Sequence, residues 1–331
     1  MLGKHYPRRF LSGVLLILLL AATARAQTTY TSILDVSSFG WLDQFSLNTP
    51  QYNLVGAEAC VPTSSVNVMT YLQNSFAAYF GTNLTGSSYE DWIGVNTTLI
   101  SSNYMNTSPT SGTPYNRLHF GLNKYVVQDL GFTNVHFSGM IPSAVWDSPP
   151  NPPAPEPRPA TIADNLPTWQ FLYDSLISGS GTVLGLTYTN LKGGHAVSLG
   201  GFDWTDLNGN GRIDFDENAQ LHFVDPLDPT RGTDPYPIGG AKFTTGRIWE
   251  VEIPDPTNSA VVYNTLELAY SQYQGTNVWG GLSGGVGSDY GLAGAYLTVA
   301  VAMTVPEPST YALLAISTAG LVGFVLRRRR P

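Results

Sequence analysis

Hydrophobic residues recur every three or four positions after residue 60, which is the spacing of side chains on one face of a helix. Pro62 suits the first turn of such a helix because its missing N–H is not needed there, and the hydroxyl side chains of residues 63–65 can satisfy neighbouring free amides. The pattern therefore predicts a helix that begins at or just after Cys60. Its packing face consists of Val66, Met69, Leu72, Phe76 and Phe80.

Two more segments have the same spacing. Residues 115–130 place hydrophobic side chains on one side and end at Gly131, and a third helix is expected after Thr168, which can act as its cap. By contrast, residues 27–51 and 81–114 have no regular pattern, and we expect irregular structure in the first and turns in the second. The predicted packing face of the third helix consists of Trp169, Leu172, Tyr173 and Leu176.

The periodicity changes to that of strands after residue 181. Strands are predicted at residues 182–188, 195–204, 220–225, 242–253 and 293–303. Residues 261–273 fit either a strand or a helix. The glycine-rich stretch 279–287 fits a loop. Helices followed by strands in this order favour an α+β fold with an antiparallel sheet.

The N-terminus has the pattern of a secretory signal peptide. Basic residues precede the hydrophobic run Phe10–Leu20, and small residues at 24 and 26 suit cleavage. Residues 1–26 are therefore a predicted signal, the mature protein begins at Gln27, and the protein is exported.

The C-terminus combines three parts in order: a Pro306-Glu307-Pro308 motif, an uncharged run at 311–326 and the arginines 327–330. Residues 305–331 closely resemble the PEP-CTERM sorting signal of Gram-negative bacteria. The resemblance implies a transient inner-membrane anchor at 311–326, processing by an exosortase, and delivery to the cell surface or the extracellular polysaccharide matrix. A permanent single-pass transmembrane anchor is the alternative.

The charge of the mature part is strongly negative. Eight of the 16 Lys and Arg residues lie in the two terminal segments, which leaves eight against nearly all of the 24 acidic residues, a charge near −16. Such a surface repels nucleic acid and suits divalent cations. We therefore expect no nucleic-acid partner.

Cys60 is the only cysteine in the chain. In an exported protein it has no partner for an intramolecular disulfide, so its thiol is either hidden or used. The positive end of a helix favours the thiolate, which is the reactive form of cysteine. The alternative is a small buried side chain that fills a gap in the core.

His195 and Asp225 are the next candidates. His195 follows two glycines at the start of a predicted strand, and Asp225 ends the next strand, where Pro226 stops pairing. Adjacent antiparallel strands can bring the two side chains together, which is the arrangement that orients a catalytic imidazole. A structural histidine is the alternative.

Three segments, taken in chain order, resemble the papain-like cysteine peptidases. They are Cys60 followed by Pro62-Thr63-Ser64, then Gly194-His195-Ala196-Val197, then Val224-Asp225-Pro226. The bacteriocin-processing-like branch is the most similar. The resemblance implies a papain-like α+β fold over residues 27–304 and cleavage of a peptide or protein substrate. It makes Cys60 the nucleophile, His195 the general base and acid, and Asp225 the residue that orients His195.

The chain departs from the family pattern at two positions. Leu54 stands where the family usually has a Gln that binds the oxyanion, and Val61 stands in place of the usual Gly after the cysteine. Gln51, nine residues before Cys60, is the candidate substitute. An inactive calcium-stabilised binding protein of the surface or matrix, and an acyl transferase with the same triad, remain alternatives to the peptidase.

Residues 206–217 fit the twelve-residue calcium loop, with oxygen ligands at positions 1, 3, 5, 9 and 12 and glycine at position 6. Predicted strands flank the loop, so the ion would brace the connection between the strands of His195 and Asp225 as a structural Ca²⁺. A plain polar hairpin loop is the alternative. The expected ligands are Asp206, Asn208, Asn210, the Arg212 carbonyl, Asp214 and Glu217.

Overall fold

The computed structural model describes residues 27–44, 58–147, 157–188, 193–227, 240–254, 262–270 and 293–306. The predicted signal at 1–26, Gln51, Leu54, most of a proline-rich connection predicted at 148–160, and the anchor at 311–326 lie outside these ranges. Among the described residues, no helix has the length and hydrophobicity needed to cross a membrane.

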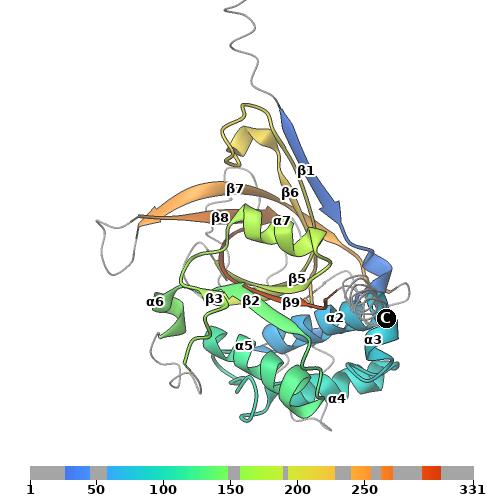
Figure 1. The fold of residues 1–331 in the computed structure, drawn as a ribbon. Helices are drawn as coiled ribbons and strands as arrows, with labels where there is room; N and C mark the ends of the chain where they lie inside the picture. Colours follow the sequence, from blue (N-terminus) through green and yellow to red (C-terminus); the bar gives the residue numbers. More distant parts are fainter. Residues whose placement is uncertain are drawn as a thin grey trace, which may run out of the picture.

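Six antiparallel strands form a closed barrel (Figure 1). Each strand pairs with the next along the chain, and the last pairs back with the first. Closure leaves no unpaired edge among these strands. They are β4 (Gly181–Tyr188), β5 (Gly194–Asp206), β6 (Gln220–Val224), β7 (Thr244–Pro254), β8 (Val262–Tyr270) and β9 (Ala293–Thr304). The predicted strands are thus confirmed, and the ambiguous segment at 261–273 contains a strand.

Three further strands extend the sheet. β1 (Thr28–Ile33) pairs antiparallel with the second half of β5, β2 (His136–Met140) pairs with the end of β9, and β3 (Ile162–Ala163) lies parallel to β2. The expectation of irregular structure at the mature N-terminus is therefore wrong for residues 28–33. Pairing with a strand about 170 residues away stabilises this segment, and local periodicity does not report such a partner.

The predicted helices are present. Cys60–Ser75 forms α2, Tyr115–Asn123 forms α5 and continues as a π-helical turn η4 over Lys124–Asp129, and Trp169–Ile177 forms α7. The Thr168 hydroxyl caps α7 by accepting the Phe171 N–H at 3.3 Å. The shorter helices are α3 (Ala77–Phe80), α6 (Ser143–Trp146), and the 3₁₀ turns η1 (Val36–Ser38) and η5 (Phe215–Glu217).

One long helix lies where the sequence predicted turns. α4 spans Tyr89–Ile100 within the segment that was expected to form turns. Ser88 and Asp91 form a capping box at its start, in which the Ser88 hydroxyl accepts the Asp91 N–H at 3.1 Å and Asp91 accepts the Ser88 N–H at 3.0 Å. The polar residues that suggested turns are thus partly the residues that begin this helix.

A hydrophobic core lies on each face of the barrel wall. Alternate residues of β4 and β5 point to opposite faces, so Val183 and Ala196 join the core under the helices, whereas Leu184 and Val197 join the core inside the barrel. Figure 1 shows α2, α3, α4 and α5 grouped on one side of the barrel and α7 away from them. The α+β class is therefore confirmed, in the form of a six-stranded barrel with helices, and α2 lies on the outer face of the β4–β5 pair.

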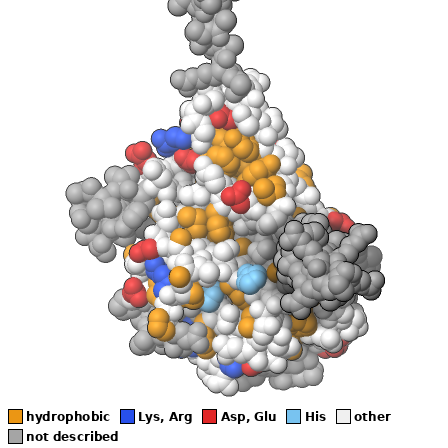
Figure 2. Space-filling view, viewed as in Figure 1, with side chains coloured by type: hydrophobic (Ala, Val, Ile, Leu, Met, Phe, Trp, Pro, Cys, Tyr) orange, Lys and Arg blue, Asp and Glu red, His pale blue; other side chains and the backbone are white. Residues whose placement is uncertain are grey.

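The described surface agrees with the sparse charge of the sequence. On the face drawn in Figure 2, Lys and Arg side chains stand singly among uncharged and acidic groups. A surface of this kind offers no continuous basic track over the described part of that face.

Candidate active site

Two buried hydroxyl groups join the start of α2 to β5. Ser64 Oγ donates to the Ala196 carbonyl at 2.9 Å, and Ser198 Oγ donates to the Ser64 carbonyl at 3.0 Å. Both serines are fully buried. This reciprocal pair holds the first turn of α2 against the strand that begins with His195.

The hydroxyl side chains of residues 63–65 do not cap α2 as predicted. Ala59 is the N-cap of α2, and no side chain caps it. Ser65 Oγ donates back to the Val61 carbonyl at 2.8 Å, and Thr63 accepts from the Asn96 side chain at 2.9 Å. These side chains bond to the core around the helix start rather than to its free amides, so the capping expectation is wrong. Pro62 does occupy the first turn, as predicted.

The structure brings Cys60, His195 and Asp225 together. Nε2 of His195 lies 2.8 Å from Oδ1 of Asp225, and the pair is buried, with side-chain exposures of 3% and 0%. Asp225 Oδ1 also accepts the Leu227 N–H at 2.8 Å, which fixes the carboxylate. The Cys60 side chain also interacts with the His195 ring and acts to raise its pKa. Because Nε2 faces Asp225, Nδ1 is the nitrogen left for the thiol.

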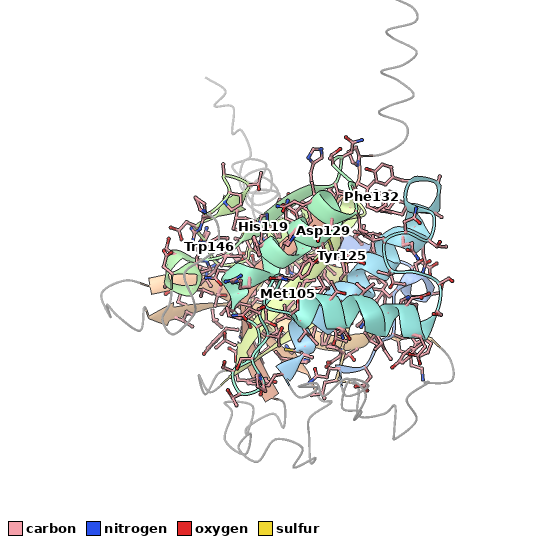
Figure 3. The ribbon with its side chains drawn as sticks, turned by 90° about the horizontal axis from the view of Figure 1, so that it is seen from below. Met105, His119, Tyr125, Asp129, Phe132 and Trp146 are labelled. Atoms are coloured by element: carbon pink, nitrogen blue, oxygen red, sulfur yellow. The ribbon has the colours of Figure 1, made fainter. Side chains whose placement is uncertain are left out.

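Electrostatics at His195 favour the imidazolium. Burial alone lowers the pKa of this ring, but the charge and hydrogen bond of Asp225, together with the Cys60 side chain, raise the pKa to about 10. His119 on α5 gives the contrast, because burial lowers its pKa to about 4. Figure 3 shows His119 in the helical part of the molecule, in the region of Tyr125 and Asp129. His195, unlike His119, has the partners of a catalytic imidazole.

Each of the two glycines before His195 is favoured at its position for a different structural reason. Gly193 has φ of +85°, a backbone conformation that other residues adopt at a cost. A Cβ on Gly194 would overlap the Leu186 carbonyl oxygen and lie 3.0 Å from the Tyr115 hydroxyl. Both observations explain why a pair of glycines leads into the His195 strand.

Three residues around the thiol were not predicted. Tyr115 and Tyr188 are half-buried; burial raises the pKa of each phenol, and the charge of Cys60 adds to the effect. Tyr115 also donates its hydroxyl to the Leu186 carbonyl at 3.0 Å. The charge of Glu58, two residues before Cys60, acts on Tyr188 as well. They come from α5, β4 and the segment before α2, which sequence spacing does not connect.

A fourth unpredicted residue is Gln44. It is fully buried, and its backbone N–H donates to the Pro226 carbonyl at 3.0 Å, so it lies beside the residue that follows Asp225. A buried side-chain amide on a segment bonded to this residue is the kind of group that can bind an oxyanion. Gln51, the residue predicted for this role, lies outside the described residues.

Residues 206–217 form a tightly curled loop between β5 and β6. The Asp206 carboxylate accepts the backbone N–H groups of Gly209, Asn210 and Gly211 at 2.6, 3.2 and 2.8 Å. Gly211, at position 6 of the loop, has φ of +72°. The backbone therefore has the sharp turn that a calcium loop needs at this position.

The loop side chains fit a cation at some positions more clearly than at others. The amides of Asn208 and Asn210 both donate to Asp214 Oδ2, at 2.6 and 2.8 Å, so positions 3, 5 and 9 meet at one point. Turning these amides by 180° presents oxygen there, but it removes the acceptors of the Asn210 and Arg212 N–H groups. Glu217, at position 12, instead accepts the Trp204 Nε1–H and the Leu207 N–H, both at 2.8 Å. Among the described residues, no three His, Cys, Asp or Glu side chains are arranged to hold a metal.

One comparison with known proteins identifies a segment of the chain. The profile of the PEP-CTERM protein-sorting motif matches residues 304–330. This match confirms the expected C-terminal signal, which implies that the protein is exported and sorted to the surface by an exosortase. No curated protein matches the chain.

Proposed function

We propose that this exported protein is a papain-like cysteine peptidase in which Cys60 is the nucleophile. The observation that carries the proposal is the buried His195–Asp225 pair in contact with the only cysteine, at the N-terminus of α2. A buried imidazolium beside a thiol stabilises the thiolate, and the helix N-terminus acts in the same direction. A structural histidine in a core has no need of both partners.

The chemistry follows from these positions. The Cys60 thiolate attacks the carbonyl carbon of a peptide bond, and the His195 imidazolium gives its proton to the leaving amine, which departs and leaves a thioester on Cys60. The now neutral His195 takes a proton from water, whose oxygen attacks the thioester. The acid product leaves, and the thiolate–imidazolium pair is restored. Asp225 keeps the ring oriented and favours its charged form throughout.

The oxyanion needs hydrogen-bond donors. The Cys60 backbone N–H at the start of α2 is one, and a Gln side chain is the second in this proposal. Gln44 is the better-supported candidate because it is held beside Pro226, and Gln51 is the competing one. Replacing each in turn distinguishes them.

A structural calcium ion is the second part of the proposal. Asp206, Asn208, Asn210, Asp214 and the Arg212 carbonyl would hold it, with Glu217 as a sixth ligand only if it leaves its present donors. Bound there, the ion would supply a rigid cross-link between β5 and β6, the strands of His195 and Asp225. Calcium titration calorimetry and melting of the full chain test this. A raised Tm with calcium that is lost in Asp206→Ala is expected, and an unchanged Tm refutes it.

Digestion of a peptide library tests the peptidase proposal directly. The protein, Cys60→Ser and His195→Gln are incubated with the library, and new termini are read by mass spectrometry. Cleavage by the protein alone supports the proposal. Products joined to an added amine would show an acyl transferase instead. Binding of peptides without any product would favour the inactive surface or matrix protein.

A further inference from the structure

We propose that Glu58 is a specificity-determining residue that selects substrates with a positively charged group next to the scissile bond. This inference rests on the peptidase proposal, because it names the substrate class of the same site. The chemical class is a peptide with a basic side chain or a free amino terminus at this position.

Glu58 lies just before the first turn of α2. It stands two residues before Cys60 and is half-buried. A Cβ on Gly112 would lie 3.2 Å from Glu58 Oε2, so the turn formed by the Ser108–Gly112 bridge packs against the carboxylate. The carboxylate is therefore confined between the start of α2 and this turn.

The Glu58 carboxylate and the Cys60 thiol act electrostatically on the same side chain. Tyr188 is influenced by the charge of Cys60 and by that of Glu58. A substrate whose carbonyl carbon meets the sulfur thus has neighbouring groups within the field of Glu58. Electrostatic effects of this kind act over several ångströms, particularly where water is partly excluded.

Among the described residues, no Lys, Arg or His side chain forms an ion pair with Glu58. None of the ion pairs found there includes it. Burial raises the pKa of its carboxyl, which shows that desolvation of this group is not compensated. An incoming ammonium or guanidinium group supplies the missing charge, and a guanidinium can bind both carboxylate oxygens.

Labelling of Cys60 with methanethiosulfonate reagents tests the charge effect without any need for turnover. Rates are measured for a trimethylammonium reagent and for a neutral methyl reagent, and their ratio is taken within each variant. The whole protein is negative and favours the cation by itself, so variants are compared. Glu58→Gln and Glu58→Ser should each lower the ratio by about tenfold, the effect of one nearby charge in a partly screened site.

The matched control is Asp174→Asn, which removes one exposed acidic charge on α7 and should leave the ratio unchanged. Glu58→Asp retains the charge and should keep most of the ratio. An equal ratio in wild type and in either neutral Glu58 variant overturns the inference, whatever the catalytic activity.

Peptide pairs then separate the two sources of the charge. Cleavage rates are compared for arginine against citrulline near the scissile bond, and for free against acetylated amino termini. A preference that Glu58→Gln abolishes in one pair identifies the basic side chain or the terminal amine as the selected group. Cleavage with no preference in either pair overturns the inference but leaves the peptidase proposal standing, whereas absence of cleavage removes the latter.

Discussion

The His195–Asp225 pair predicts a particular dependence of stability on pH. A histidine whose folded pKa lies near 10 retains its proton in the folded protein, whereas an unfolded histidine loses it near pH 6.5. The folded state then binds one more proton than the unfolded state between these values. The stabilisation is complete below about pH 6.5 and is lost as the pH rises through about 10, by about 1.4 kcal/mol per pH unit.

The thiol must be removed to see this slope alone. In Cys60→Ser, Asp225 still raises the pKa of His195, so the free energy of unfolding should fall between pH 7 and pH 9 because of His195, by up to about 3 kcal/mol. Adding Asp225→Asn keeps the shape and an acceptor for the Leu227 N–H but removes the charge. Burial then lowers the pKa of His195, as it does for His119, and the slope should vanish.

Denaturant unfolding at fixed ionic strength measures these slopes. With Cys60 present, a thiolate in the folded protein releases the proton that the imidazolium gains, so the slope should be nearly flat up to about pH 8.5, where an unfolded cysteine ionises. Equal slopes in Cys60→Ser with and without Asp225→Asn would refute the ion pair. A steep slope with Cys60 present would refute the folded thiolate.

Three more predictions concern the parts that position the triad. Ser64→Ala and Ser198→Ala should each cost about 1 kcal/mol of unfolding free energy, measured by denaturant unfolding, and the losses should be nearly additive in the double variant because each hydroxyl donates to a backbone carbonyl that the other substitution leaves in place; a neutral effect of either substitution would contradict these hydrogen bonds. Gly194→Ala should cost about 1–3 kcal/mol and slow Cys60 labelling, since the new methyl group meets the Leu186 carbonyl; a Tm equal to wild type would speak against the close approach. Gln44→Ala should lower kcat/KM by about 10²- to 10³-fold while Gln51→Ala has little effect; the reverse order would move the oxyanion role to Gln51.

The sequence was sufficient for the parts of the site that depend on local pattern and on neighbouring strands. The helix at Cys60 follows from its hydrophobic spacing, and the approach of His195 to Asp225 follows from β5 and β6 being consecutive antiparallel strands. Single-sequence reasoning can recover such features because each depends on few residues that are close along the chain.

Other features depend on contacts between distant segments. β1 is a strand because it pairs with β5, and Gln44 lies beside Pro226 because its backbone N–H donates to the Pro226 carbonyl. The serines after Cys60 looked like capping residues, yet they bond to β5 and to the core. Local pattern cannot distinguish a hydroxyl that caps a helix from one that crosses to a strand, because both occupy the same positions.

The proposed mechanism requires that His195 activates Cys60 as a thiolate. The most direct measurement is the rate at which iodoacetamide modifies Cys60 in the folded protein between pH 5 and pH 9, with His195→Ala as the comparison. The account predicts a rate near pH 6.5 at least about tenfold above that of a free cysteine, of which only about 1% is ionised there, and a loss of this excess in His195→Ala. Modification only after unfolding, or equal rates in the two proteins, would contradict it.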